Sequence, residues 1–256
     1  MEYGRLIDAL DLVREQYQQA VFLPQTVGSE HILQSSAVLE DIDRLLCISG
    51  LRAPFFALSN SESGIAPFEF APFHDAFTAM ASTGVLLEQV LTAGTTLVLR
   101  HTQVTFPGMR ALVARLEAMR PWATIQANCY LTPANAPGLL PHSDPRDTIL
   151  FQQAGIKRWR IWPLGTVDPA GPPDDMLPDS YSKQPPRLDV LLHSGDVLFI
   201  PKGCVHAANT ESVHSLHITL GVLDTLAIEG RTVALQGVRE GFPATAFGSQ
   251  HLTTIV

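Results

Sequence analysis

Apolar residues repeat at helical spacing through the first half of the chain. Over residues 4–20 one helical face collects Leu6, Ile7, Leu10, Val13 and Tyr17. Further helices are predicted over 37–48 and 84–93, and a short apolar strand over 95–100. After Pro107, residues 109–120 form a stripe of Met109, Leu112, Val113, Leu116 and Met119. We interpret all of these stripes as surfaces that face a core.

The pattern changes after Pro121, where short apolar or alternating runs are separated by glycine and proline. Strands are predicted over 124–131, 148–153, 157–162, 188–193, 196–201 and 215–222. Several short strands within about a hundred residues indicate a β-sandwich or barrel. Residues 163–187 interrupt them with seven prolines and two glycines. Such a long irregular loop is either a lid or an exposed connection.

Three regions follow from this pattern. Residues 1–122 are predicted to be a helical region that packs on the core, and residues 123–223 a β-rich core that includes loop 163–187. Residues 224–256 are predicted to be a short appendage. The fold class is therefore mainly β with some α.

Composition supports a globular protein with one main domain, since 46% of its 256 residues are hydrophobic and 16% are charged. The net charge of −8 argues against nucleic acid as a partner, because phosphate binding needs basic surface. No basic segment followed by an apolar one begins the chain, and no apolar run reaches the ~20 residues that span a membrane. We therefore expect neither a signal peptide nor a membrane partner.

Three cysteines, Cys47, Cys129 and Cys204, lie far apart and form no CxxC pair. This spacing predicts neither a disulfide framework nor a structural zinc site. Each cysteine is expected to be a small buried apolar residue, and the usage fits a cytoplasmic protein.

A candidate metal site begins with His142 and Asp144, which share one face if they lie on a strand. His206, just beyond the strand 196–201, can supply a third ligand. His193, His214 and His217 lie in the same region, and spacing alone does not choose among the four. Two histidines and one carboxylate are the facial triad of non-haem Fe(II) oxygenases. Zinc accepts the same ligands.

Two segments, 127–162 and 191–222, resemble the cupin-like JmjC oxygenase family, in particular its ribosomal oxygenase branch. The first contains Asn-x-Tyr-x-Thr-Pro, then His-x-Asp, then Gly-x-Lys-x-Trp. The second contains Gly-Asp-Val-Leu, Pro-x-Gly, the second histidine and Ser-x-His-x-Thr. All of these pieces occur in the order and at the spacing typical of the family.

The resemblance implies a double-stranded β-helix (cupin or jelly-roll) core with Fe(II), 2-oxoglutarate and O2 as reactants. By position, it implies His142, Asp144 and His206 as catalytic iron ligands. It also implies that Lys157, Tyr130 and Thr219 bind the distal carboxylate of 2-oxoglutarate and that Asn128 lines the pocket. The expected activity is a dioxygenase that hydroxylates an amino-acid side chain of a peptide, protein or peptide-like metabolite.

The alternation along residues 157–161 independently predicts an anion near Lys157. Lys157, Trp159 and Ile161 share one face of the strand, whereas Arg158 and Arg160 share the other. A lysine on an apolar face is costly unless an anion meets it. The alternative is a lysine whose stem is buried and whose ammonium reaches solvent. The two arginines are expected to be solvated.

Two departures from the family concern the substrate. Ser143 stands where the family often has Tyr or Phe, and Pro145-Arg146 is an unusual continuation after Asp144. Ribosomal members also carry a dimerisation segment and a winged-helix domain after the core, where this sequence has residues 224–256. This difference weakens the expectation that the substrate is a ribosomal protein, and a homodimer stays open.

Three alternatives to hydroxylation stay open at this point. Demethylation of an N-methyl group uses the same oxidative chemistry. A non-redox metallocupin, such as a zinc or manganese isomerase or hydrolase, needs the triad but not Lys157. A binding module would keep the cupin core without turnover.

Overall fold

The computed structural model describes residues 4–24, 56–60, 64–66, 94–139, 141–163 and 185–224. The predicted helices 37–48 and 84–93, most of loop 163–187, the appendage and Cys47 lie outside these residues. Within the described ranges, no helix is long and apolar enough to cross a membrane.

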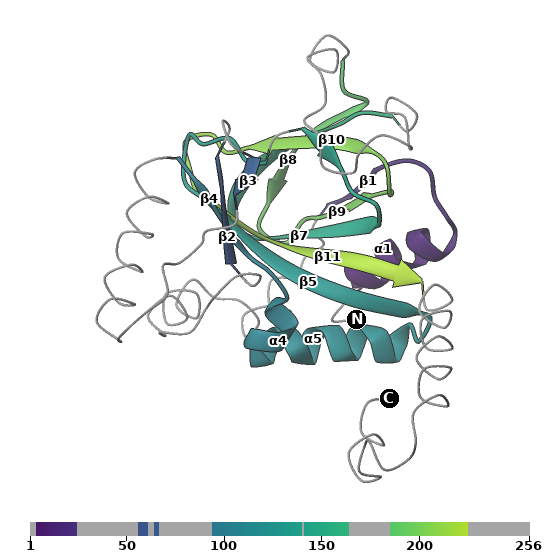
Figure 1. Ribbon diagram of the computed structural model, residues 1–256. Coiled ribbons are helices and arrows are strands. Elements are labelled where there is room, and N and C mark those ends of the chain that lie inside the picture. Colours follow the sequence, from purple (N-terminus) through teal and green to yellow (C-terminus); the bar gives the residue numbers. More distant parts are fainter. Residues whose placement is uncertain are drawn as a thin grey trace, which may run out of the picture.

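Eleven strands and three helices make up the described part of the chain (Figure 1). The helices are α1 (Gly4–Arg14), α4 (Thr102–Thr105) and α5 (Pro107–Met119). The strands are β1 (Val21–Leu23), β2 (Phe56–Asn60), β3 (Gly64–Ala66), β4 (Thr96–Leu99), β5 (Ala123–Thr132), β6 (His142–Ser143), β7 (Asp147–Ile161), β8 (Leu188–His193), β9 (Val197–Ile200), β10 (Val205–Asn209) and β11 (Ser215–Asp224).

The strands form two antiparallel arrays that share β7. The larger array has the order β1-β9-β7-β11-β5-β4-β2-β3. The smaller one joins β8 and β10 to the second half of β7, and β6 to β10. Strands β5 and β11 pair along their whole length, from Ser215 opposite Thr132 to Asp224 opposite Ala123.

Gly155 allows β7 to pass from one array to the other. Residues 148–151 pair with β9, whereas residues 156–161 pair with β8. Gly155 has φ +67°, and a Cβ there would lie 1.8 Å from the His214 carbonyl oxygen. The two strands predicted over 148–153 and 157–162 are therefore one strand bent at a glycine that no larger residue can replace without strain.

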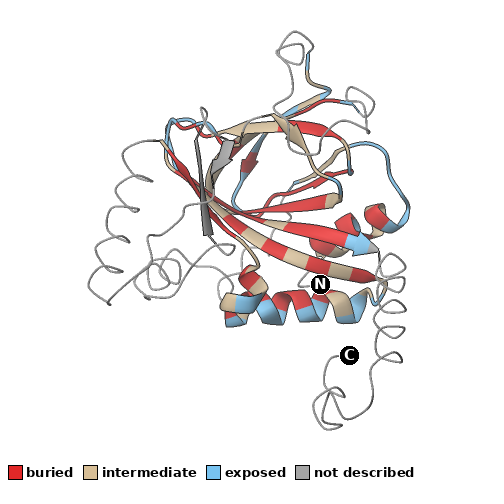
Figure 2. Cartoon of the chain, in the orientation of Figure 1, coloured by how far each residue is buried: buried red, intermediate tan, exposed pale blue. Residues whose placement is uncertain are grey.

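One apolar core lies between the helices and the larger array. The buried face of α5 comprises Met109, Leu112, Val113 and Leu116, and it packs with Ile125, Ala127 and Cys129 of β5. Figure 2 shows the same helix exposed on its opposite side. Arg120 at the end of α5 donates two hydrogen bonds of 2.6 Å to Asp11 of α1, which ties the helices together.

A second core fills the space between the two arrays. It contains Leu150, Trp159, Ile161, Leu192, Leu198, Ile200 and Cys204. Buried Cys129 and Cys204 are free thiols packed in the two cores, as predicted for these cysteines. Lys157 lies on the same inward face of β7 as Trp159, so the second core ends at a buried cation.

Two residues that were predicted to face the core, Tyr17 and Met119, are exposed. Helix α1 stops at Arg14 rather than residue 20, since Gln16 takes a left-handed conformation and the chain turns towards β1. Tyr17 is consequently 41% exposed. Met119, in the last turn of α5, is 40% exposed because the buried face ends at Leu116.

Candidate metal centre

His142 and His206 face each other because β6 and β10 are paired antiparallel. In this register His206 is the direct partner of His142, and Val205 is the partner of Ser143. Their ring centroids lie 4.3 Å apart. A two-residue strand thus brings together two histidines that are far apart in the sequence.

Asp144 completes the cluster from the residue after β6. Its Oδ2 lies 3.7 Å from Nε2 of His206 and accepts a hydrogen bond from the Thr148 hydroxyl at 3.2 Å. One ligand atom each from His142, Asp144 and His206 lie within 4.8 Å of one another. Three groups at this separation can hold one metal ion, and their types suit Fe(II) or Zn(II).

His206 is oriented and kept neutral by its surroundings. Its Nδ1 lies 3.0 Å from the Cys204 carbonyl oxygen, which fixes that nitrogen as the donor and leaves Nε2 towards Asp144. Burial and the neighbouring His142 lower the pKa of His206 to about 4. A neutral imidazole with a free Nε2 is the form that binds a metal.

The structure separates the other three histidines by exposure. His193 and His214 are exposed on the surface, whereas His217 is buried beside the cluster. The rings of His217 and Tyr130 stack in parallel, with centroids 4.8 Å apart. Burial lowers the pKa of His217 well below its usual value, and the nearby Lys157 lowers it further.

Lys157 is 2% exposed, and its Nζ stays inside the protein. The alternative, a lysine whose ammonium reaches solvent while its stem is buried, is therefore wrong. Its Nζ donates a hydrogen bond of 2.8 Å to the Thr132 hydroxyl and lies 5.7 Å from the Trp159 ring centroid. No carboxylate of the described residues lies within ion-pair distance of this Nζ. Burial lowers the pKa of Lys157 to about 7.

A chain of hydroxyl groups supports the Lys157 ammonium. The Thr132 and Thr96 hydroxyls lie 3.0 Å apart, and the Thr96 hydroxyl donates to the Pro137 carbonyl oxygen at 3.4 Å. The Thr132 hydroxyl oxygen accepts the hydrogen bond from Lys157, so the Thr132 hydroxyl can itself donate a hydrogen bond to the Thr96 oxygen. Gly138 covers the amine, since a Cβ on it would lie 3.4 Å from Nζ.

One cavity joins the metal cluster to Lys157. Its lining includes the three candidate metal ligands and Lys157. Its polar wall consists of Thr96, Tyr130, His142, Asp144, Thr148, Lys157, His206, His217 and Thr219. Tyr130 and Thr219 thus line the same cavity as Lys157. Burial and the nearby Asp144 raise the pKa of Tyr130 to about 12, so its hydroxyl is a donor at neutral pH.

Asn128 and His217 differ from the sequence prediction. Asn128 lies beside the cavity rather than in its wall, because its Oδ1 accepts a hydrogen bond from the His101 backbone N–H at 3.0 Å. His217 lines the cavity, and its Nδ1 has no hydrogen-bond partner in the described structure. The signal for His217 is its alternation with Thr219 on β11, which places both on one face.

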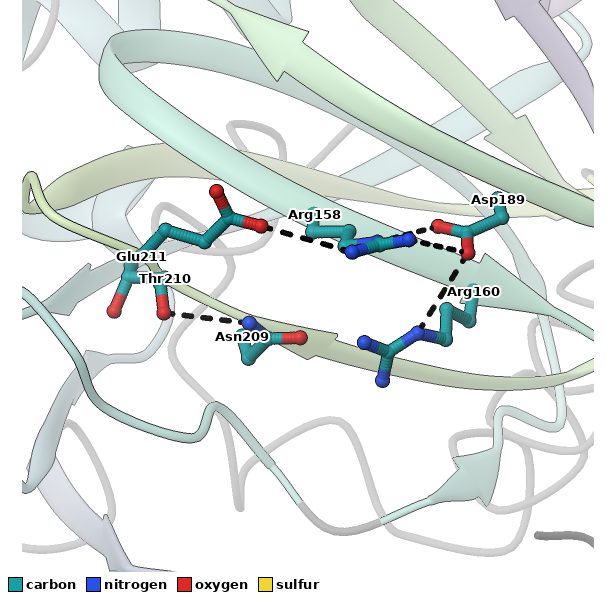
Figure 3. A network of polar contacts seen from close by, with 6 residues as sticks. All are labelled: Arg158, Arg160, Asp189, Asn209, Thr210 and Glu211. Carbon is teal, nitrogen blue, oxygen red and sulfur yellow. Dashed lines mark hydrogen bonds and ion pairs between the residues drawn. The ribbon is translucent and has the colours of Figure 1, made fainter.

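The opposite face of β7 carries a surface ion-pair network (Figure 3). Arg158 donates to both carboxylate oxygens of Asp189, at 2.7 and 2.9 Å, and lies 3.7 Å from Glu211. Arg160 lies 3.9 Å from Asp189. The two arginines that were predicted to be solvated are therefore partly exposed and paired. Lys157, on the other face of β7, is buried and lines the cavity.

Comparison with known proteins shows a domain match and several relatives. Residues 105–228 match the JmjC domain family. The bifunctional lysine-specific demethylase and histidyl-hydroxylase NO66 of Drosophila grimshawi is 41% identical over 123 residues, or 45% of this chain and 16% of that protein. NO66 of Caenorhabditis elegans is 38% identical over 100 residues, or 38% of this chain and 13% of the relative. The match thus spans about one sixth of these relatives or less.

Solved structures of YcfD, a ribosomal oxygenase from Escherichia coli, share the fold. The complex of YcfD with cobalt and 2-oxoglutarate gives a TM-score of 0.56 at 17% identity, over 90% of this chain and 56% of YcfD. The complex of YcfD with cobalt and succinic acid gives 0.57 at 16% identity, over 96% of this chain and 61% of YcfD. At such identity the likeness establishes the fold, and it confirms the predicted jelly-roll core.

Proposed function

We propose that this chain is an Fe(II)- and 2-oxoglutarate-dependent dioxygenase of the cupin-like JmjC family, in its ribosomal oxygenase-like branch. The match of residues 105–228 to the JmjC domain and the similarity to the NO66 relatives support this proposal. The proposed reaction is the hydroxylation of a C–H bond in an amino-acid side chain. The substrate is a protein or peptide, since both groups of relatives carry names that refer to protein substrates.

One observation carries this proposal: a single cavity is lined both by the facial triad and by a buried lysine that has no carboxylate partner among the described residues. A triad alone suits several metals and reactions. A lysine buried without a carboxylate is costly in free energy unless a ligand supplies the anion. A small dicarboxylate that also reaches the metal meets both requirements, and 2-oxoglutarate has this form.

The residues present fit iron and 2-oxoglutarate as bound groups. His142, Asp144 and His206 would hold the metal and leave three coordination positions open. When bound, iron and 2-oxoglutarate would activate O2, so that one oxygen atom converts C–H to C–OH and the other enters succinate as 2-oxoglutarate loses CO2. Lys157, Tyr130 and Thr219 would hold the distal carboxylate, and the apolar second core would exclude water.

The proposal is tested by turnover with peptides that contain histidine or methyl-lysine, the side chains in the name of the NO66 relatives. We expect succinate formation that depends on Fe(II), and a product heavier by one oxygen atom. His206→Ala should abolish both signals. The matched control His193→Ala changes an exposed histidine outside the cavity and should leave both unchanged. Equal succinate formation by His206→Ala would contradict the proposal.

Demethylation is the second candidate, because the relatives are also named as lysine-specific demethylases. Hydroxylation of an N-methyl group releases formaldehyde, whereas hydroxylation of a side-chain carbon does not. Demethylation would be favoured if the amount of formaldehyde equals the amount of succinate and if only methyl-lysine peptides are substrates.

A non-redox metallocupin is distinguished by the Lys157→Ala variant. The activity of such an enzyme would not need this lysine, whereas succinate formation by the proposed dioxygenase would.

A further inference from the structure

Arg146 follows the metal-binding candidate Asp144 by two residues and lies next to strand positions that line the cavity. Its position follows from strand register, because Gly221 of β11 pairs with Thr148 and with Gln126 of β5. Thr148 and Thr219 line the cavity, and Gly221 is the next residue along the same face of β11. The Arg146 side chain lies against Gly221, since a Cβ there would come within 2.7 Å of its Cδ.

Two contacts hold Arg146 in place. Its Nη1 donates a hydrogen bond to the Gln126 side-chain oxygen, and its stem occupies the space that the missing Gly221 side chain leaves. A guanidinium fixed at both its stem and one nitrogen loses little entropy when it binds an anion. Its remaining N–H groups are available for a ligand.

This guanidinium has no carboxylate partner in the described structure, although the protein carries a net charge of −8. Arg158 and Arg120, by contrast, each bind an aspartate through two hydrogen bonds. Arg146 and Arg100 both act electrostatically on Tyr130 in the cavity wall, and each lowers the pKa of that tyrosine. Both guanidinium groups therefore act on the Tyr130 side of the cavity wall, where the Asp144 carboxylate has the larger effect and raises this pKa.

We propose that Arg146 is a specificity-determining residue that binds a carboxylate of the substrate close to the side chain that is hydroxylated. The inference rests on the proposed function for the meaning of "substrate". An aspartate or glutamate side chain near the target residue has the required chemistry, because a guanidinium and a carboxylate can form two parallel hydrogen bonds. Lys157 does not compete for this group, because it lies buried deeper in the same cavity.

Retention of peptides by the metal- and 2-oxoglutarate-loaded protein under anaerobic conditions tests this proposal. The probe is a pool of random nonapeptides with acetylated and amidated ends, so that aspartate and glutamate are their only carboxylates. We expect retained peptides to be enriched in these residues, and Arg146→Gln to reduce that enrichment by about tenfold or more, the effect of losing a charge-assisted bond. Arg146→Glu should enrich lysine and arginine instead.

Two further variants keep the test informative. Gly221→Ala should displace the guanidinium and reduce the enrichment without altering the residues next to Asp144. Arg158→Gln is the matched control, because it removes a paired arginine from the outer face of β7 and should retain acidic peptides like the wild type. Wild-type protein that retains no acidic peptides, or an Arg146→Gln variant that retains them equally, would overturn the proposal.

The same preparations separate this proposal from the proposed function. The absorption band of bound iron and 2-oxoglutarate reports on the oxygenase site, whereas peptide retention does not require turnover. A band without acidic enrichment rejects the role of Arg146 alone. Acidic enrichment without a band supports the carboxylate subsite and rejects the oxygenase.

Discussion

The Lys157 Nζ donates a hydrogen bond of 2.8 Å to the Thr132 hydroxyl, and both groups are buried. Thr132 belongs to β5 and Lys157 to β7, so this bond links the two strands that flank β11. Since the Thr132 hydroxyl in turn contacts Thr96, the ammonium is held in one orientation before any ligand arrives. Such preorganisation reduces the entropy that cosubstrate binding costs.

Replacement of Thr132 by valine should therefore weaken 2-oxoglutarate binding without affecting the metal. Valine has the size of threonine but cannot accept the hydrogen bond from the Lys157 Nζ. The loss of a hydrogen bond to a charged group costs about 1.5–3 kcal/mol. We expect the Kd for 2-oxoglutarate to rise about tenfold or more, with an unchanged Kd for Fe(II). Calorimetry under anaerobic conditions measures both, and Thr132→Ser should restore the wild-type value. An unchanged Kd in Thr132→Val would show that Thr132 does not position the lysine.

Binding of 2-oxoglutarate should depend on pH through Lys157. Burial lowers the pKa of this lysine to about 7, whereas a bound carboxylate favours the charged ammonium. Above pH 7 the free protein must therefore take up a proton to bind, and the Kd should rise with pH. The Lys157→Ala variant should bind weakly at every pH. A wild-type Kd that is constant from pH 6.5 to about 8.5 would contradict the role assigned to the ammonium.

The same pKa shift affects the stability of the ligand-free protein in the opposite direction. An unfolded lysine keeps its proton up to about pH 10.4, whereas folded Lys157 loses it near pH 7. Between these values the unfolded chain binds more protons, so the Lys157 contribution to stability rises with pH. Chemical unfolding of the wild type and Lys157→Met at pH 7 and 9 measures it, and an equal pH effect in both proteins would exclude Lys157 as its source.

Thr148 should tune the metal site through Asp144. Its hydroxyl donates to Asp144 Oδ2 at 3.2 Å, and partners of metal ligands typically contribute about 10–100-fold to metal affinity. Thr148→Val should thus raise the Kd for Fe(II) by about tenfold, and Thr148→Ser should retain the wild-type value. Metal content after dialysis against graded chelator provides the measurement. Identical retention of metal by the valine variant would remove Thr148 from the site.

Gly155 should be far less tolerant of alanine than Gly94. Both have positive φ, +67° and +63°, so alanine costs about 1–2 kcal/mol of backbone strain at either position. At Gly155 the new Cβ would also clash with the His214 carbonyl, whereas at Gly94 the nearest atom is 3.7 Å away. Thermal unfolding should therefore show a clearly larger loss for Gly155→Ala. Equal losses would mean that the bend of β7 does not need a glycine.

Local patterns predict the longer strands and the helix α5. Alternation along residues 124–131 predicts the buried and half-buried positions of β5, and residues 188–193 coincide with β8. Short strands escape such patterns, because β1, β6 and β10 exist through their partners rather than through their own periodicity. The same limit applies to β7, where periodicity cannot tell a bend at Gly155 from the end of a strand.

The site was predictable to the extent that neighbours in sequence share a strand face. Lys157 and Trp159 satisfy this condition on β7, whereas Asp144 follows β6 directly and still joins His142 in the cluster. The approach of His206 to His142 depends on the register between β6 and β10, which only the motif resemblance supplies. The contacts of Arg146 with Gln126 and Gly221 are likewise long-range, so the local sequence marks that arginine only as an unusual residue beside Asp144.

The most direct test of the central claim is an anaerobic titration of metal-free protein with Fe(II) and then 2-oxoglutarate, followed by the metal-to-ligand charge-transfer band. The wild type should develop the band, His206→Ala should not, and Lys157→Ala should need a much higher concentration of 2-oxoglutarate. Arg158→Gln should behave as the wild type. Absence of the band from wild-type protein that binds zinc or manganese tightly would contradict the account and favour a non-redox metallocupin.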